Sequence, residues 1–527
     1  MIEDAPAPPP GHIVMLVDNA VEGDSRVQKT ARTTAAAGWR VTLLGVSPDG
    51  PKRWSCGDAR VSLLRIPRAR LLRERAYRRG WRTPLAHPSP MAARRATDGA
   101  ALRAADREFT AAVAGHPPPP AGWLRARWAG LRRRQTAAKN AADQRITLLD
   151  RLRYRLARRC RGDRAWRTLE PYLWRYETAL GRTIDTLAPD IIHANDTRML
   201  GVAVRAARRA RLAGREVRVV WDAHEYLPGM AGAGLADRWL PAHLAYQREY
   251  VRHADAVVTV AEPIADLLER DLALPERPLV LQNVPALDHP VTDADRERYG
   301  DLRRTCGLPA DTPLLVYSGS PAPQRGLDTF VEALPLLPGV HLALVIGKPA
   351  APYPRELVAR AAALGVGDRL HLTPYVPHWY LVEYVRTASV GLIGNVHWPN
   401  HELSLNTKFF EYSHAHLPLV TSDVRTIATM VARTGQGEVF AAEDTEDFAR
   451  AVRTVLADPD RYRRALAAPG LLDRWTWAEE VRGLHALYTR LGGPAAPAAG
   501  SAVRAPAQPG APAAPAALAG TDPSPTR

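Results

Sequence analysis

The stretch SLNTKFFEYSHAHLPLVTSD (residues 404–423) decides the fold, because it joins an amphipathic helix directly to a buried strand. Asn406, Lys408 and Glu411 lie at the start of that helix, and the apolar run LPLVTSD (417–423) follows it as the expected strand. Polar residues in a first helical turn are often only caps, so a ligand-binding role for them needs further support. The direct passage from helix to strand is typical of a parallel sheet covered by helices on both faces.

The same alternation of strands and helices extends in both directions from this stretch. We expect strands of the first half at 12–19, 39–46, 60–67, 190–195, 217–225, 255–262 and 278–284. We expect strands of the second half at 313–320, 340–347, 369–376, 389–396 and 417–423. The pattern predicts an α/β protein with two doubly wound, Rossmann-like domains that face each other across a cleft, where ligands bind beyond the carboxyl ends of the strands.

Changes in composition set the expected domain boundaries. We place the N-terminal domain at 11–287 and the C-terminal domain at 288–491, with the last helix returning toward the N-terminal domain. Residues from about 68 to 166 are rich in arginine and alanine and show no strand pattern, so we expect a basic helical insertion in the first domain. The alanine- and proline-rich tail, 492–527, is predicted to be disordered.

The formal net charge of +16 favours an anionic partner. A phosphorylated substrate, an acidic membrane surface and a nucleic acid all fit this charge, but the sequence contains no recognisable nucleic-acid-binding module. No apolar run approaches the roughly 20 residues of a membrane-spanning helix, and the N-terminus lacks the basic start and apolar core of a secretory signal. We therefore predict a cytoplasmic protein, with peripheral binding to the inner face of the membrane through the basic insertion as an open alternative.

Two strand ends in the second half carry groups suited to phosphate. Gly319 permits a close turn, and Arg325 places a cation at the start of the next helix. Thr407 and Lys408 offer backbone amides and a second cation at a helix N-terminus, which is a natural anion site. Glu411, one turn further on, can accept two hydroxyl hydrogen bonds, so the set together suits a diphosphate linked to a ribose. Taken singly, Arg325 is explained as a solvated cation and Glu411 as an acid that the helix dipole favours.

The order of these segments resembles the nucleotide-sugar half of bacterial family 4 glycosyltransferases with the B-type fold. The resemblance rests on YSGSPAPQRGLDTFVEALPLL, LALVIG, RLHLTPYVP and NTKFFEYSHAHLPLVTSD. In the first half, NAVEGDSRVQKTARTTAAAGWRVTLLG, PDIIHANDTRM, VVWDAHEY and ADAVVTVAEPIADLL are similar to the acceptor-side domain of that family. The resemblance spans about 11–67 and 168–491. It implies retaining transfer of a sugar from a nucleotide diphosphate sugar to an unknown acceptor, with no metal or other cofactor.

The resemblance also assigns roles on the donor side. Glu411 matches the glutamate that binds the donor ribose, and residues 406–408 match the segment whose amides meet the diphosphate. Arg325 matches a basic residue, usually lysine, that neutralises the same phosphates. An earlier glutamate of the family falls on Leu403 here, with Glu402 one place away. We therefore keep Glu402 as a catalytic candidate.

The acceptor side is matched less closely. Asn195 stands where many relatives carry a histidine near the reacting sugar. His224 and Glu225 end the next expected strand and should point into the same cleft, so His224 is the second catalytic candidate. Asp24 and Arg26 match a loop that faces the phosphates or the acceptor. A buried structural histidine, and a helix cap followed by a surface arginine, are the open alternatives.

Other functions have weaker support from the residues. The Asp-Ala-Asp at 293–295 resembles the metal-binding signature of the other glycosyltransferase fold, but it lies in the inter-domain linker, where a solvated acidic turn is the simpler explanation. We expect no metal, because helix N-termini and cations stabilise the leaving phosphate in the B-type fold. A nucleotide-sugar epimerase would need an added acid/base pair against the sugar, and none is evident. A nucleic-acid-binding protein rests only on the charge and the arginine-rich insertion.

Overall fold

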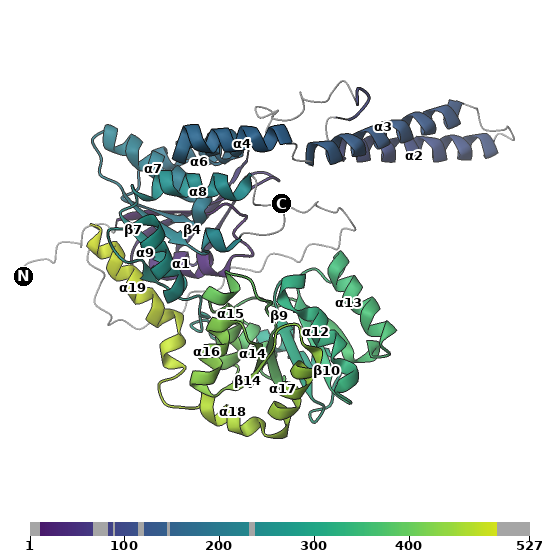
Figure 1. The fold of residues 1–527 in the computed structure, drawn as a ribbon, viewed down its shortest axis with the longest axis vertical. Helices are drawn as coiled ribbons and strands as arrows, with labels where there is room; N and C mark the ends of the chain where they lie inside the picture. The colour runs from purple at the N-terminus through teal and green to yellow at the C-terminus, as the bar shows by residue number, and fades with distance from the viewer. Residues whose placement is uncertain are drawn as a thin grey trace, which may run out of the picture.

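The computed structural model describes residues 11–66, 83–87, 90–113, 121–144, 148–230 and 238–492. Figure 1 shows two lobes, each built on a mainly parallel sheet with helices around it. The predicted α/β fold with two Rossmann-like domains is therefore confirmed.

The first sheet has the strand order β3-β4-β2-β1-β5-β6-β7-β8. Its strands are β1 (His12–Leu16), β2 (Arg40–Ser47), β3 (Lys52–Cys56), β4 (Ala59–Arg65), β5 (Ile191–Asn195), β6 (Arg218–Ala223), β7 (Ala256–Thr259) and β8 (Leu279–Val280). All neighbours pair in parallel except β3 and β4, which pair antiparallel at one edge. All five residues of the central strand β1 are buried, as expected for a parallel strand covered on both faces.

The second sheet has the order β11-β10-β9-β12-β13-β14 and is parallel throughout. Its strands are β9 (Leu314–Ser318), β10 (His341–Ile346), β11 (Leu370–Pro374), β12 (Val390–Ile393), β13 (Leu419–Ser422) and β14 (Gly437–Phe440). The residues of β9, LLVYS, are all buried in the middle of this sheet. The chain order reverses on either side of β9, and such a point in a parallel sheet is where ligands bind.

Helices cover both sheets. Around the first sheet lie α1 (Ser25–Ala36), α5 (Trp166–Leu169), α6 (Trp174–Leu187), α7 (Asp196–Leu212), α8 (Trp239–Val251) and α9 (Glu262–Leu272). The linker and the second lobe contain α10 (Asp293–Tyr299), α11 (Leu302–Thr305), α12 (Leu327–Glu332), α13 (Pro352–Ala363), α14 (Leu381–Val385), α15 (Thr407–His414), α16 (Arg425–Thr434), α17 (Thr445–Ala457) and α18 (Pro459–Leu466). The helices α1 and α15 both begin at the carboxyl ends of their sheets, so the first turns of both lie at the edge where ligands bind.

The described part of the expected insertion is helical. It contains α2 (Pro90–Val113), α3 (Ala121–Gln144) and α4 (Leu148–Arg161). In Figure 1, α2 and α3 lie side by side and project away from the first lobe, whereas α4 lies along that lobe. Residues 67–82, 88–89, 114–120 and 145–147 of this region are outside the described residues.

The last helix, α19 (Trp477–Arg490), packs on the first lobe (Figure 1). The Trp477 indole N–H donates to the Thr33 hydroxyl at 3.1 Å, and the Tyr488 hydroxyl lies 2.7 Å from Nδ1 of His193. The expected disordered tail, from residue 493 on, is outside the described residues. None of the described helices is both long and apolar enough to cross a bilayer.

Three details of the sheets differ from the sequence-based expectation. The edge strands β3 and β14 were not predicted, because neither forms a continuous apolar run. The strand expected at 278–284 is shortened to the two residues of β8. Beyond β8 the chain leaves the sheet, and Leu281 makes one last backbone hydrogen bond to Thr259 at 2.8 Å.

Candidate active site

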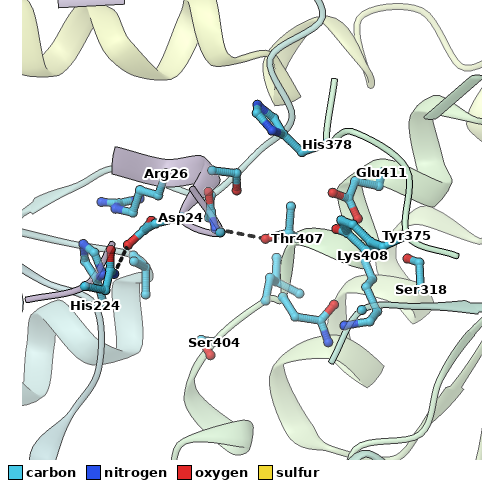
Figure 2. Close-up of a pocket in the computed structure, with 18 of the residues that line it drawn as sticks. Asp24, Arg26, His224, Ser318, Tyr375, His378, Ser404, Thr407, Lys408 and Glu411 are labelled. Carbon is cyan, nitrogen blue, oxygen red and sulfur yellow. Dashed lines mark hydrogen bonds between the residues drawn. The ribbon is translucent and has the colours of Figure 1, made fainter. Parts of the chain in front are cut away.

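A cavity of about 660 Å³ lies between the carboxyl ends of the two sheets. Its first-lobe wall is formed by the loop after β1, the start of α1 and His224 after β6. Its second-lobe wall is formed by Ser318 at the end of β9, Gly319 just after it, Arg325, Tyr375 after β11 and the first turn of α15. Figure 2 shows the labelled side chains of the two lobes facing each other across this space.

The first turn of α15 presents an anion site to the cavity. Asn406 is the N-cap of the helix, and its Oδ1 accepts from the Phe409 N–H at 3.3 Å, so the capping explanation is correct for this residue. Its Nδ2 is buried without a hydrogen-bond partner. Thr407 accepts from Nδ2 of Asn283 at 2.9 Å, which links the two lobes (Figure 2). The free amides of a first helical turn attract negative charge, so a phosphate is well matched to this place.

Lys408 and Glu411 lie one turn apart and both line the cavity (Figure 2). Burial lowers the pKa of Lys408, and burial raises the pKa of Glu411, although each opposite charge partly counters the effect on the other. The Glu411 side chain makes no hydrogen bond to any described residue. Lys408 Nζ lies over the Tyr317 ring, 5.0 Å from its centroid. A diphosphate would supply a partner for the half-buried Lys408, and a ribose would supply one for the buried Glu411.

Two glycines allow the loops to approach this wall. Gly319 has φ +125°, and a Cβ there would lie 2.9 Å from Nζ of Lys408. Gly326 has φ +68°, and a Cβ there would lie 2.0 Å from the carbonyl oxygen of Gly394. Both conformations favour glycine. Arg325, between the two, is half-buried and donates to Oδ1 of Asn395 at 3.3 Å, so most of its guanidinium remains available to a ligand.

The side chains of the first-lobe wall are bound to one another. Asp24 caps α1 by accepting from the Val27 N–H at 3.2 Å, and it also accepts from Nδ2 of Asn19 at 2.9 Å. Arg26 is buried and donates to both Asp222 oxygens at 2.9 Å and to the Leu281 carbonyl. Its guanidinium therefore joins α1 to β6 and to the chain after β8. Asp24 and Arg26 both line the cavity, so their loop faces the cleft as the resemblance implied.

His224 lies beside two carboxylates. Its Nδ1 is 3.4 Å from Asp196 and its Nε2 is 3.4 Å from Asp222. Burial lowers the pKa of His224, but the two carboxylates outweigh burial and raise the pKa to about 9. At neutral pH the imidazole is therefore protonated, so it acts as a cation and a hydrogen-bond donor and cannot act as a general base.

Two sequence candidates lie away from the cavity. Asn195 is fully buried and its Nδ2 donates to the Leu16 carbonyl at 3.0 Å, so it ties β5 to β1. Glu402 turns toward the start of α16, where it contacts Nδ1 of His397 at 2.6 Å and accepts from the Arg425 N–H at 2.8 Å. The Glu402 carboxylate therefore contacts the start of α16 and does not line the cavity.

Sequence reasoning missed several residues of the cavity. Asn283, Tyr375, His378 and Ser318 line the cavity. Lys29 lies behind this lining in α1, where it is buried and its Nζ donates to Oδ1 of Asn283 at 2.6 Å. Tyr375 and Ser318 lie at or just after strand ends, so the strand-end argument that found Arg325 would have found them too.

The Asp-Ala-Asp motif has a structural role. Asp295 and Thr292 form a capping box at the start of α10, in which the Asp295 carboxylate accepts from the Thr292 N–H at 3.0 Å. No cluster of three or more metal-ligating side chains occurs within the part of the chain that the structure describes.

Comparison with known proteins agrees with this geometry. The family described as Glycosyltransferase Family 4 matches residues 141–283, and the family described as Glycosyl transferases group 1 matches residues 312–458. The first match contains His224 and Asn283 of the first-lobe wall, and the second contains the cavity-lining residues of the second lobe. Both halves of the chain thus match family models of glycosyltransferases, and the resemblance inferred from its motifs is confirmed.

Curated relatives are named D-inositol 3-phosphate glycosyltransferase. The protein from Geodermatophilus obscurus is 29% identical over 306 residues, which are 51% of this chain and 66% of the relative. The protein from Nocardia farcinica is 28% identical over 302 residues, which are 50% of this chain and 65% of the relative. The matched part thus spans slightly less than two thirds of each relative.

Solved structures show the same fold at low sequence identity. Sucrose-phosphate synthase from Thermosynechococcus elongatus is 16% identical, with a TM-score of 0.57 over 91% of this chain and 99% of that chain. Anabaena HepE, solved in complex with UDP and glucose, is 11% identical, with a TM-score of 0.56 over 91% of this chain and 100% of that chain. These likenesses confirm the two-domain B-type glycosyltransferase fold.

Proposed function

We propose that this protein is a retaining glycosyltransferase, which moves a sugar from a nucleoside diphosphate sugar to a hydroxyl-bearing acceptor. The observation that carries the proposal is the second-lobe wall of the cavity, where the first turn of α15, Lys408 and Arg325 converge beside Glu411. Amides and cations suit a diphosphate, and an unpartnered carboxylate suits the hydroxyls of a ribose. HepE of Anabaena was solved with UDP and with UDP-glucose, so uridine diphosphate sugars are the first donors to test.

In the proposed reaction, the bond between the anomeric carbon and the diphosphate oxygen breaks, and a bond from the acceptor oxygen to the same carbon forms. The resemblance to family 4 glycosyltransferases supports attack on the face that the diphosphate leaves. The departing diphosphate takes the bonding electrons, and Lys408, Arg325 and the α15 amides stabilise its charge. His224 is already protonated at neutral pH, so the acceptor proton passes to the departing diphosphate instead.

We also propose that the enzyme works at the anionic inner face of a membrane, with α4 as the contact. Leu148, Leu152 and Leu156 are 81%, 63% and 59% exposed. Their spacing of four residues places them on one face of the helix, opposite the buried Tyr154. The stripe is flanked by exposed arginines, Arg151, Arg155 and Arg159. An apolar stripe beside arginines is the pattern of a helix that lies on acidic lipid.

A donor screen tests the proposed activity. The purified protein is incubated with a panel of nucleotide sugars, and both thermal shift and released nucleoside diphosphate are measured, with and without candidate acceptors. We expect one donor to raise the melting temperature and to release nucleoside diphosphate faster when an acceptor is present. A sugar nucleotide that is isomerised without release of nucleoside diphosphate would instead indicate an epimerase. Failure of every nucleotide and nucleotide sugar to stabilise the protein would contradict the donor site itself.

A further inference from the structure

A second, smaller cavity of about 190 Å³ adjoins the active site at His224, which lines both spaces. It lies entirely in the first lobe. Its walls come from Asp18 after β1, the start of α7, Glu225 after β6 and the start of α8. A space of this size accommodates a single six-membered ring. Because His224 lines both cavities, a ring in the small cavity would lie next to the sugar of a donor bound in the large one.

His243, on α8, gives the cavity an unsatisfied hydrogen-bond acceptor. The residue is 2% exposed, and its Nδ1 lies 2.9 Å from the Trp239 carbonyl, to which it donates. Burial lowers the pKa of His243 to about 3, so Nε2 carries a lone pair at neutral pH. That Nε2 is buried and has no partner within the described structure. A hydroxyl or an ammonium group from a ligand would satisfy it.

Trp239 provides the apolar part of the same wall. Its ring stacks on the His243 ring, with centroids 3.9 Å apart and an angle of 23° between the planes. Trp239 is half-buried and lines the cavity, so part of its surface stays open to a ligand. The combination of an aromatic face and inward hydrogen-bond acceptors suits a polyhydroxylated ring, whose C–H groups pack on the aromatic surface.

The charges around the cavity are mostly negative. Asp18, Asp196 and Glu225 contribute three carboxylates. The Arg198 guanidinium is bound to Asp18 at 2.5 Å, and His224 is shared between Asp196 and Asp222. Glu225 is exposed and has no ion-pair partner among the described residues. A phosphate in this cavity would face these carboxylates without a free cation to balance its charge.

The backbone at Asp196 is a further indication that the small cavity is a functional site. Asp196 is the first residue of α7 and has φ +63°, a left-handed conformation that is costly for a residue other than glycine. The conformation holds the Asp196 carboxylate between His224 and the small cavity. Strain of this kind persists where the surrounding structure requires a side chain in one place.

We propose that the small cavity is the acceptor subsite and that it selects a ring bearing hydroxyl or amino groups, not a phosphate ester. The inference rests on the proposed glycosyltransferase function. It separates this chain from its curated relatives, which are named for inositol 3-phosphate. The ring stacks on Trp239, donates hydrogen bonds to His243 and the carboxylates, and directs one hydroxyl past His224 toward the donor sugar.

Ligand binding to the full chain tests this selection. Three probes share one ring and differ in a single group: myo-inositol, an amino-deoxyinositol and an inositol monophosphate. Binding is measured by saturation-transfer NMR and calorimetry, in the presence of the nucleoside diphosphate found in the donor screen. We expect the amine to bind best and the phosphate at least tenfold more weakly than the amine. A phosphate that binds as well as the amine, or binding of none of the three, would overturn the inference.

Two variants sharpen the test. Asp18→Asn releases Arg198 from its partner, so we expect the preference to shift toward the phosphate by about tenfold. His243→Phe keeps the stack on Trp239 and removes the acceptor nitrogen, so we expect weaker binding of all hydroxylated probes. Thermal unfolding shows whether each variant is folded, and its stabilisation by the nucleoside diphosphate shows that the donor wall is intact. Normal donor binding with unchanged probe preference in both variants counts against the subsite alone, whereas loss of donor binding in the unaltered protein counts against the proposed function.

Discussion

The two walls of the cleft use their charged groups in opposite ways. On the first-lobe wall, Arg26, Asp222 and His224 are bound to one another, and little of their charge is left for a ligand. On the second-lobe wall, Glu411 makes no hydrogen bond within the described residues and Arg325 makes only one long contact to Asn395. Charges that are mutually satisfied rigidify a wall, whereas charges without partners are kept for a ligand.

The largest expected effect is therefore on stability and comes from the first-lobe wall. Asp222→Asn leaves the buried guanidinium of Arg26 and the imidazolium of His224 without their shared carboxylate. Breaking a buried ion pair costs about 3–5 kcal/mol, because a charge remains uncompensated. We expect the melting temperature to fall by roughly 10 °C, as measured by calorimetry.

The matched control removes both charges. In the double variant Arg26→Met with Asp222→Leu, no unpaired guanidinium or carboxylate remains, so we expect most of the lost stability to return. If Asp222→Asn alone leaves the melting temperature unchanged, the first-lobe wall is not held together by this ion pair.

The pH dependence of stability gives the next largest effect. The pKa of His224 is raised in the folded protein to about 9, because Asp196 and Asp222 outweigh burial and the nearby Arg26. The protonated imidazole therefore stabilises the folded state. This contribution is complete when the pH is below the pKa of histidine in the unfolded chain, near 6.5, and it is lost as the pH rises toward 9. We expect the unaltered protein to lose roughly 2–3 kcal/mol relative to His224→Gln between pH 6.5 and 9, measured by denaturant unfolding. If the free energies of unfolding of the two proteins change in parallel with pH, Asp196 and Asp222 do not raise the pKa of His224.

Substitutions in the second-lobe wall should weaken donor binding and leave the stability of the protein nearly unchanged. Glu411→Ala and Arg325→Ala each remove a group that binds the donor in the proposed function, and a charged hydrogen bond contributes about 1.5–3 kcal/mol. We expect the donor KM to rise by roughly ten- to a hundredfold while the melting temperature stays within a few degrees. Arg325→Lys is the matched control, since it keeps the charge and should retain most of the affinity. An unchanged donor KM in Glu411→Ala would contradict the proposal that Glu411 binds the ribose of the donor.

The same contrast explains what the sequence could predict. The second-lobe wall of the cavity was predictable because its residues lie in one local pattern: a strand end, a glycine turn and the first turn of α15. The first-lobe wall depends on contacts between distant segments, such as Arg26 with Asp222. No local pattern shows that Arg26 would turn inward, that Asn195 would bind the Leu16 carbonyl, or that Glu402 would face α16. The fold itself followed from the alternation of buried strands and helices, and only short edge strands escaped it.

The smallest expected effect concerns α4, whose exposed leucines contrast with the ordered walls of the cleft. Each leucine or arginine of this face adds on the order of 1 kcal/mol to binding of acidic lipid, so single changes weaken binding only a few-fold. We expect Leu152→Glu to reduce co-sedimentation with vesicles that contain acidic lipid, and neither protein to bind vesicles of neutral lipid. Leu212→Glu is the control, because Leu212 is 82% exposed on a different helix, α7.

A fluorescent label gives a second measurement on α4. Cys160 is exposed and continues the stripe of leucines one turn further, so a polarity-sensitive dye on Cys160, in a Cys56→Ser and Cys306→Ser background, should brighten only with acidic vesicles. Equal, negligible binding to both kinds of vesicle at low salt would leave α4 as a scaffold for the first lobe.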